Sequence, residues 1–376
     1  MTKFLEVHVI QSLPPSNINR DDTGAPKSGV YGGANRLRVS SQAWKRATRL
    51  QFADEIAESQ RATRTKRIVR LVSDAIMARG VEDEQRAASL ATEVLKAAGV
   101  TPKKPRSKDD ATISEADYEA EALFFISNQQ VQALAEVAVA DPDKVDKTAA
   151  KNAIDTSHGI EIALFGRMVA SSPDLNVDAS LQVAHAISTH TVDPQGDFYT
   201  AVDDQKRRND DDAGAGMVGT IEFSSATLYR YAALSLDLLS ENLGQATEVT
   251  ADAAAQFVKA FTLSLPSGKK NSMAADTLPS MVLVTLRESR PVNLVGAFER
   301  PVPVSDEGFV ARSVAALVRR AQDLDATFGT APLKTWVVAE SEVSAEASSL
   351  GDLTSLPQAI SSIRETVLAE LSEDAS

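Results

Sequence analysis

The chain contains no cysteine among its 376 residues. This absence excludes disulfide bonds, thiolate metal ligands and cysteine nucleophiles. No apolar run approaches the ~18 to 20 residues that a membrane-spanning helix requires, so we expect no membrane partner. The N-terminal sequence MTKFLEVHVI also lacks the long apolar core and the small-residue cleavage site of a secretory signal. Together these absences favour a cytoplasmic protein.

Aromatic residues are scarce as well, at 12 Phe, 5 Tyr and 2 Trp. A sheet that recognises RNA by stacking bases carries a basic–glycine–aromatic core sequence, and none is present. If the protein binds RNA, we therefore expect contacts with the sugar-phosphate backbone to dominate.

The common catalytic and nucleotide-binding motifs are missing. The chain has no GxSxG nucleophile motif, no HExxH zinc motif and no GxxxxGK[ST] phosphate loop. A G-x-G-x-x-G pattern occurs at Gly214, Gly216 and Gly219, but an acidic run precedes it and the strand-like TIEF follows it. Dinucleotide binding needs a strand before the pattern and a helix after it, so this one indicates a hairpin connection. We predict no cofactor, no metal and no catalytic residue.

The four histidines are His8, His158, His185 and His190. The positions of His185 and His190 differ by an odd number, so on a strand the two side chains face opposite sides and cannot share a metal ion without a bend. RNA cleavage assisted by His8 remains open, although a structural role is the favoured interpretation.

Basic residues are outnumbered overall, and the net charge is −13. In the first fifty residues, however, eight basic residues stand against three acidic ones, a net of +5. A reversal of sign within one window predicts a polyanion site. The last 56 residues hold two basic and ten acidic residues, a net of −8. That polarity would suit head-to-tail contacts between copies, with a solvated acidic tail as the alternative.

The basic window reads as a strand followed by a helix. Gly32-Gly33 leads into Arg36-Leu37-Arg38-Val39, whose alternation directs both arginines to one face of a strand. Ser40 and Ser41 then offer N-cap hydroxyls for a helix that begins near Gln42.

One face of that helix is polar and mostly cationic. At about 100° per residue, the face spans roughly one 100° arc and excludes Trp44, Ala47 and Thr48. Its members are Gln42, Lys45, Arg46 and Arg49. A helix N-terminus with hydroxyls and a cationic stripe suits a phosphate backbone. A solvated basic helix face is the alternative.

Hydrophobic periodicity divides the rest of the chain. Residues 4–10 alternate as a strand with one face on a core. A helical, alanine-rich region follows, with apolar stripes over residues 68–76 and 90–98 that end at Gly80 and Gly99.

From about residue 180 the period returns to two. Residues 181–192 and 220–231 read as strands that flank a polar excursion at 193–219, which predicts an extended hairpin. A further strand is expected at 280–285 and a helix at 308–323. The pattern predicts an α+β body with a helical insertion and a projecting hairpin.

A series of short motifs runs along the chain. The first fifty residues contain NRDD (19–22), GG (32–33) and R-x-R-x-S-S-Q-x-x-K-R-A-x-R (36–49). Further motifs follow in order: IALFGRM (162–168), AHAISTH (184–190), TAVDD (200–204), EFSS (222–225), YRYA (229–232) and ENLG (241–244). In this collinear order, over nearly the whole chain, they resemble the backbone subunit of Cascade, the type I-E CRISPR surveillance complex (the CasC family).

This resemblance implies a non-enzymatic RNA scaffold with an α+β fold. A modified RRM-like (ferredoxin-like) palm would comprise residues 1–54 and 176–376, with a helical fingers insertion at 55–175 and a β-hairpin thumb at 190–224. Copies would polymerise along the CRISPR RNA (crRNA) and present it to target DNA in antiviral defence. The implied partners are crRNA, target DNA through the guide, other copies of the chain and other Cascade subunits.

The resemblance also implies roles for individual residues. The residues that would hold guide phosphates are Arg20, Lys27, Ser40, Gln42, Lys45, Arg46 and Arg49. Met168 would pack against bases beside a displaced nucleotide, and Phe198, Tyr199 and Thr200 would form part of the thumb wedge. The chain departs from the family at Ala34 and Asn35, which replace basic residues and leave only Arg36. It also departs in the thumb, where three aspartates follow Lys206-Arg207-Arg208.

Two other classes of function fit the sequence less well. A metal-independent CRISPR endoribonuclease of the same RNA-binding superfamily would need a general acid and a general base at the scissile phosphate, and no convincing pair is evident. A sequence-specific DNA-binding module is disfavoured, because neither a helix-turn-helix nor a zinc signature occurs.

Overall fold

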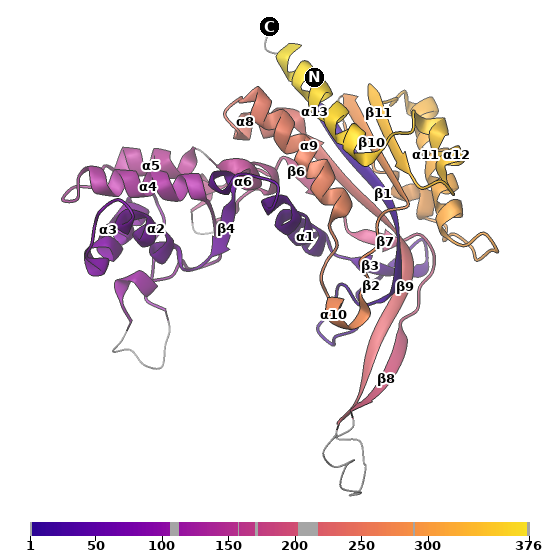
Figure 1. Ribbon diagram of the computed structural model, residues 1–376, viewed down its shortest axis with the longest axis horizontal. Helices are drawn as coiled ribbons and strands as arrows, with labels where there is room; N and C mark the ends of the chain where they lie inside the picture. The colour runs from indigo at the N-terminus through magenta and orange to yellow at the C-terminus, as the bar shows by residue number, and fades with distance from the viewer. Residues whose placement is uncertain are drawn as a thin grey trace, which may run out of the picture. The chain divides into compact units, whose positions relative to one another are not determined.

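The computed structural model describes residues 2–105, 113–156, 158–169, 172–201, 217–288 and 290–373 (Figure 1). The chain folds into two compact units. The first, here called the sheet unit, contains Met1–Gln51, Val183–Ala233 and Phe257–Ile363. The second, the helical unit, contains Phe52–Gln182, Leu234–Gln256 and Arg364–Ser376. Each unit is therefore assembled from segments far apart in the sequence.

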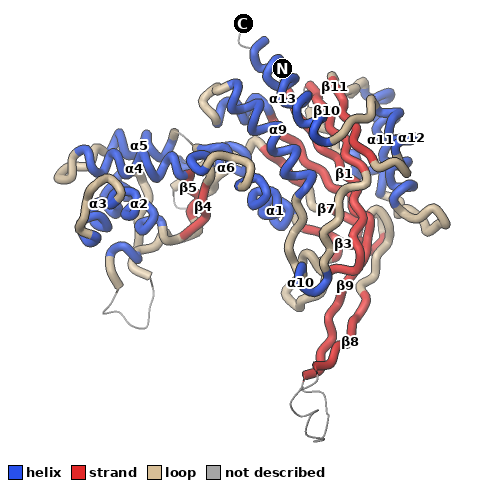
Figure 2. Tube along the Cα trace, viewed as in Figure 1, coloured by secondary structure: helices blue, strands red, loops and turns tan. Residues whose placement is uncertain are grey.

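The sheet unit is built around one β-sheet whose strands differ in length (Figure 2). Its strand order is β11-β10-β1-β9-β7-β3-β2, and β6 and β8 also pair with β9. The strands are β1 (Lys3–Ser16), β2 (Ser28–Tyr31), β3 (Ala34–Val39), β6 (Leu181–Val183), β7 (Ala186–Ser188), β8 (Gln195–Ala201), β9 (Met217–Ser235), β10 (Met281–Glu288) and β11 (Lys334–Ala339). With helices on both faces, this sheet confirms the predicted α+β class.

Two helices pack on opposite faces of the sheet. Leu228 of β9 belongs to a buried cluster with Trp44 of α1 (Ser41–Ala53). The next residue, Tyr229, belongs to a different cluster with Leu317 of α11 (Val310–Phe328). Because successive strand residues point to opposite faces, α1 and α11 cover different sides of the sheet. The remaining helices that include sheet-unit residues are α9 (Thr247–Leu263), α10 (Lys270–Met273), α12 (Ser344–Ala347), α13 (Leu356–Glu373), η5 (Leu294–Phe298) and η6 (Ser348–Leu350).

A buried ion pair joins the central strands to α11. The carboxylate of Glu6 on β1 accepts from Arg287 Nε on β10 at 2.7 Å and from Tyr231 Oη at 2.9 Å. The Arg287 guanidinium also lies 2.9 Å from Asp325 on α11. Removing one member would leave a buried charge without compensation, which typically costs about 3–5 kcal/mol. This network sets the position of α11 on its face of the sheet.

The helical unit follows the predicted apolar stripes. Its helices include α2 (Ile68–Met77), α3 (Glu84–Ala97), α4 (Asn128–Ala140), α5 (Lys147–Asp155), α6 (Gly159–Phe165) and α8 (Leu236–Asn242), with η1 (Glu58–Gln60), η3 (Glu115–Asp117) and η4 (Pro173–Leu175). A two-stranded sheet of β4 (Ala62–Thr65) and β5 (Phe124–Ser127) accompanies them. Gly80 and Gly99 follow α2 and α3 with φ of 98° and 92°, a conformation that favours glycine.

The expected continuous strand at 181–192 is wrong, because a bulge divides it into β6 and β7. Ile187 is opposite Tyr229, yet the Ala184 N–H donates to the Tyr231 carbonyl. One extra residue therefore lies between these two points, which is the signature of a β-bulge. His185 sits at the bulge and is exposed, whereas His190 is buried.

The predicted hairpin exists, but its first strand begins later than expected. β8 pairs with β9 in antiparallel register from Gln195–Phe223 to Ala201–Met217. The residues Phe198, Tyr199 and Thr200 therefore lie in a strand, not in a polar excursion beyond one. The connection between the two strands, with Lys206-Arg207-Arg208, Gly214 and Gly216, falls outside the described residues.

Candidate nucleic-acid interface

The segment 19–27 forms a tight loop that presents Arg20 and Lys27. The Asp21 carboxylate accepts from the Thr23 hydroxyl at 2.8 Å and from the Ala25 N–H at 3.0 Å. The Thr23 hydroxyl bond lowers the pKa of Asp21. The Lys27 N–H donates to the Asn19 carbonyl and closes the loop. Arg20 is exposed and Lys27 is half-buried.

This loop is tied to the start of α1. Asn19 Oδ1 accepts from the Ser40 N–H at 2.8 Å, and Ser40 Oγ accepts from the Ala43 N–H at 3.3 Å. Ser40 is therefore the N-cap of α1, as predicted, and it is buried. These bonds hold the loop that carries Arg20 and Lys27 against the N-terminal turn of α1.

The two predicted faces of α1 are confirmed. Trp44 and Thr48 are buried, while Gln42 and Arg46 are exposed. Lys45 and Arg49 are half-buried along the same outer stripe. The arrangement is a helix that buries Trp44 and Thr48 and carries its cationic side chains on the outer stripe, a geometry suited to an extended polyanion.

A buried arginine holds the inner face of α1. The Arg230 guanidinium lies 3.8 Å from the ring centroid of Trp44 and 4.6 Å from that of Phe261. It donates to Gln11 Oε1 at 2.7 Å and to the Phe261 carbonyl. Burial lowers the pKa of Arg230 to about 9. Two rings and two acceptors thus stabilise this side chain and, through Trp44, the orientation of α1.

Arg36 does not belong to the cationic surface, contrary to the prediction from strand alternation. It is buried and donates to the carbonyls of Ser188 and Phe298, each at 2.9 Å. Burial also lowers its pKa. Arg38 remains half-buried and bonds to the Ser28 carbonyl and to His185 Nδ1. The turn at 298–299 covers the Arg36 side of the strand, which local alternation could not reveal.

The departure at residues 34–35 also has a structural counterpart. The Asn35 side chain donates to the Val192 carbonyl at 3.0 Å, and the Val192 N–H donates back to the Asn35 carbonyl. Asn35 therefore links β3 to the segment that precedes the hairpin.

The hairpin presents different side chains on its two faces. Phe198 is opposite Thr220, and Thr200 is opposite Val218. Phe198 and Val218 consequently share one face, where they are 66 % and 56 % exposed. Tyr199 points to the other face and is half-buried.

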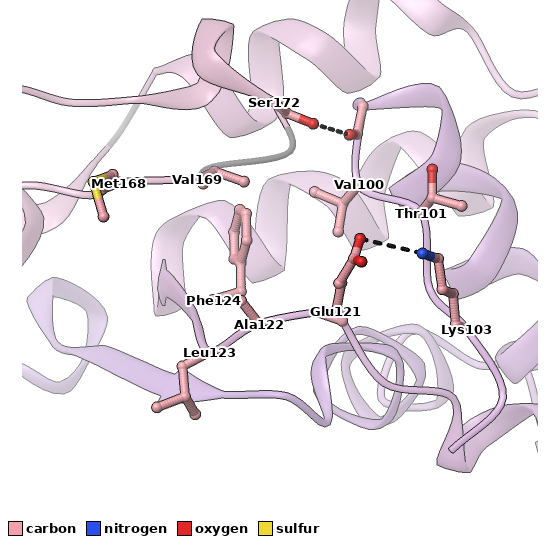
Figure 3. A pocket seen from close by; sticks show the side chains of 12 residues that line it. Val100, Thr101, Lys103, Glu121, Ala122, Leu123, Phe124, Met168, Val169 and Ser172 are labelled. Carbon is pink, nitrogen blue, oxygen red and sulfur yellow. Dashed lines mark hydrogen bonds and ion pairs between the residues drawn. The ribbon is translucent and has the colours of Figure 1, made fainter. Parts of the chain in front are cut away.

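Met168 lies in the helical unit at the edge of a hollow (Figure 3). Its side chain is 84 % exposed. The hollow has a volume of about 640 Å³, and its lining residues are Gly99, Val100, Thr101, Lys103, Ala120, Glu121, Ala122, Leu123, Phe124, Met168, Val169 and Ser172. An ion pair of Lys103 with Glu121, at 3.2 Å, borders it.

The residues before Met168 explain its exposure. Gly166 has φ of 72°, and a Cβ there would lie 2.8 Å from the Val177 carbonyl oxygen. Arg167 is buried and donates to the carbonyls of Leu175 and Ile154 at 2.8 and 3.1 Å. Burial lowers the pKa of Arg167 to about 10. A glycine turn and an anchored arginine thus hold Met168 outward.

The structure does not bring the histidines together. His8 is fully buried against Tyr229 Oη at 2.9 Å, and burial lowers its pKa to about 3. His190 stacks on Phe309 with ring centroids 3.6 Å apart. His158 contacts Gln130, and His185 contacts Arg38. His8 is therefore unable to reach an RNA phosphate, and no group of three metal-ligating side chains occurs among the described residues.

Comparison with known proteins places the chain in a family. A family model described as "CT1975-like protein" matches residues 5–363. The chain belongs to the CT1975-like family. A search of curated proteins found no match for this CT1975-like protein.

Two solved structures resemble the CT1975-like chain over its length. A chain of a "CRISPR RNA-guided surveillance complex, pre-nicking" shares 32% identity with a TM-score of 0.84, over 97% of this chain and 100% of that one. A chain of a "CRISPR RNA-guided surveillance complex" shares 28% identity with a TM-score of 0.71, over 96% and 99%. In the described part of the CT1975-like chain, no helix is long and apolar enough to span a membrane.

Proposed function

We propose that the protein is a non-enzymatic crRNA-binding backbone subunit of a type I-E Cascade surveillance complex. The observation that carries this proposal is its likeness to a surveillance-complex chain at 32% identity over nearly the full length of both chains. In such a complex, copies of the protein polymerise along the guide and interact with other Cascade subunits. The protein holds the backbone, and base pairing with target DNA reads the sequence.

The outer face of α1 supports the phosphate-holding role. Arg20 and Lys27 are tied to the N-cap region of α1, and Gln42, Lys45, Arg46 and Arg49 extend the surface along the helix. Each phosphate contact releases counterions, so RNA affinity depends steeply on salt and weakly on base identity. Ser40 contributes by capping the helix that carries these groups.

The hairpin and the Met168 loop support a role in shaping the guide. Phe198 and Thr200 lie on one face of a projecting two-stranded hairpin. An apolar side chain inserted at a base step unstacks it at a cost of a few kcal/mol. The exposed Met168 offers a polarizable surface for bases beside the displaced nucleotide. The palm, fingers and thumb division belongs to this proposal.

Incubation of the purified protein with its repeat RNA tests the absence of catalysis. We expect a mobility shift of intact RNA, and the same shift for His8→Gln and His185→Gln. Cleavage that one histidine substitution abolishes would instead identify a metal-independent endoribonuclease. Recovery of one discrete small RNA with repeat-derived ends from the purified complex would support the guide-binding role directly.

A further inference from the structure

A second cationic site lies on the sheet unit, on the α11 side of the sheet. An open hollow of about 900 Å³ is formed by α11, η5 and the residues just after η5. Its lining residues are Gly296, Ala297, Arg300, Ala316, Arg319, Arg320, Gln322, Asp323 and Ala326. Three arginines therefore surround one hollow that contains a single acidic residue.

The helix periodicity explains why these arginines share a surface. Residues 316, 319, 320 and 323 are spaced three and four apart and so form one stripe of α11. The opposite side of the helix is buried in the sheet unit through Val314, Leu317, Val318 and Ala321. Arg312 lies seven residues before Arg319 on the same stripe, roughly 10 Å away along the helix axis. The cationic surface is consequently elongated.

None of the three guanidinium groups lies within ion-pair or hydrogen-bond distance of a partner among the described residues, although Asp323 lines the same hollow. No ion pair or hydrogen bond involves the side chains of Arg300, Arg319 or Arg320 there. Arg320 Nε is also buried without a hydrogen-bond acceptor in that part of the chain. Elsewhere in the protein, arginines such as Arg70 and Arg364 each face two carboxylates. With three arginines and Asp323 as its charged lining residues, the hollow is locally cationic in a chain of net charge −13.

Arg320 is held in place by its contact with η5. A Cβ added to Gly296 would lie 3.2 to 3.4 Å from the Arg320 guanidinium. The guanidinium therefore packs directly over the glycine, and a larger residue would press on it. Since the Glu6–Arg287–Asp325 network anchors the same helix, the hollow is supported by groups that hold α11 on the sheet.

We propose that this hollow binds the phosphodiester backbone of a nucleic-acid strand other than the one held at α1. The guanidinium fork binds phosphate oxygens in pairs. Arginines around one hollow require a partner with closely spaced charges, and nucleic acid carries one charge every few ångströms. Because α1 and α11 cover opposite faces of the sheet, phosphates that lie on α1 cannot also fill this hollow.

An acidic protein segment matches the hollow less well. The most acidic part of the chain, residues 321–376, contains ten acidic residues among 56, spread over several elements. Its helix α13 carries Glu365, Glu370 and Glu373 at separations of five and three residues, together with the basic Arg364. Residues five apart do not lie on one face of a helix, so these carboxylates do not form a row of neighbouring charges that would match the three arginines.

The test is binding of fluorescent oligothymidylate, oligouridylate and a short DNA duplex to the full chain. The variant Arg300→Gln/Arg319→Gln/Arg320→Gln removes the three guanidinium groups. For a single-stranded probe that uses all three contacts, the salt dependence of log K should flatten by about 2, because each contact contributes roughly 0.7. The probe with the largest change identifies whether the site takes RNA, single-stranded DNA or duplex.

A matched control separates the site from a general charge effect. Arg70→Gln/Arg86→Gln/Arg364→Gln removes the same charge from surface arginines that already face carboxylates. It should leave the salt dependence unchanged. If both triple variants weaken binding equally, or if neither does, the proposal is wrong. Selective loss of binding to a peptide of residues 356–373 would also overturn it and indicate a protein partner.

Two further variants keep the result interpretable. Arg300→Gln/Arg319→Gln changes only the exposed pair and leaves Arg320 over Gly296, so folding should be preserved and the salt slope should fall by about 1.4. Combination with Lys45→Ala/Arg49→Ala tests independence, because separate sites give additive changes in binding free energy. If Lys45→Ala/Arg49→Ala leaves binding unchanged while Arg300→Gln/Arg319→Gln weakens it, the proposed guide-holding role of α1 is wrong and the proposed site at α11 is supported.

Discussion

The ring of Tyr199 lies over Gly219 on the neighbouring strand of the hairpin. The two residues are directly opposite in the register of β8 and β9. A Cβ at Gly219 would be 2.6 Å from Tyr199 Oη and 2.7 Å from Cζ. The absence of a side chain at Gly219 thus leaves room for the tyrosine ring, and Tyr199 packs within the hairpin itself. Phe198, on the other face, is exposed.

The variant Gly219→Ala should displace the Tyr199 ring from this position. The added methyl group would overlap the end of the tyrosine side chain. The effects of Gly219→Ala and Tyr199→Ala on the free energy of unfolding are therefore expected to be coupled. A double-mutant cycle with Tyr199→Ala measures this, with a coupling free energy of at least about 0.5 kcal/mol expected for residues in contact. Additive effects on unfolding would show that the ring does not rest on Gly219 in solution.

Phe198→Ala should alter the guide without altering the fold. Phe198 is largely exposed, so its truncation should change stability by no more than about 0.5 kcal/mol. The regular pattern of displaced nucleotides should disappear, because the apolar wedge is gone. Chemical probing of the guide in the assembled complex reads this pattern, with Gln195→Ala on the same strand as the control. Unchanged periodic reactivity would assign the wedge to another residue.

Lys45→Ala/Arg49→Ala should weaken binding of every guide by a similar factor. The lost contacts are to phosphates, so the salt dependence should flatten by about 1.4 for two contacts on a single strand. Titrations of unrelated spacer sequences at several salt concentrations measure both effects. Strong discrimination among spacers in this variant would argue against backbone holding.

Acidification should destabilise the protein through His8. Its pKa is about 3 in the folded state, compared with about 6.5 when exposed. Between these values the unfolded chain binds a proton that the folded chain does not, so stability falls as pH decreases, by up to about 1.4 kcal/mol per pH unit. Urea unfolding below pH ~6 should show a steeper loss for the wild type than for His8→Gln. Parallel pH profiles would mean that His8 is not buried in solution.

Gly32→Ala should strongly destabilise the sheet unit. Gly32 has φ of 59°, and a Cβ at this position would overlap the carbonyl oxygen of Glu299. Both the backbone conformation and the close approach exclude a side chain, and a loss of more than about 1 kcal/mol is expected. Gly33→Ala is the matched control, because it has a similar φ of 74° but no atom within 4 Å of the added Cβ. Thermal unfolding should separate the two.

Local periodicity was sufficient to predict the elements that bury one face. The stripes at 68–76 and 90–98 became α2 and α3, and the inner positions of α1 are Trp44 and Thr48. A helix or strand with a clear apolar side can bury that side against the core in only one orientation, so its exposed residues follow from the sequence. The candidate stripe on α1 was predictable for this reason.

Long-range contacts decided two features that local sequence patterns did not predict, the burial of Arg36 and the bulge between β6 and β7. Arg36 and Arg38 look equivalent by alternation, yet only Arg36 is covered by the 298–299 turn. The bulge between β6 and β7 depends on the register with β9, which lies more than forty residues away in the sequence. No nearby residue signals either event.

The sequence by itself determined the α+β class, the amphipathic helices and the concentration of cations near α1, because these depend on residue type and spacing along one element. Only the tertiary structure decided which cations face solvent and which are buried. It also brought Arg300 of the loop beside Arg319 and Arg320 of α11, and Tyr199 over Gly219. These relationships arise from packing between segments distant in sequence, and such packing leaves no periodic trace in either segment.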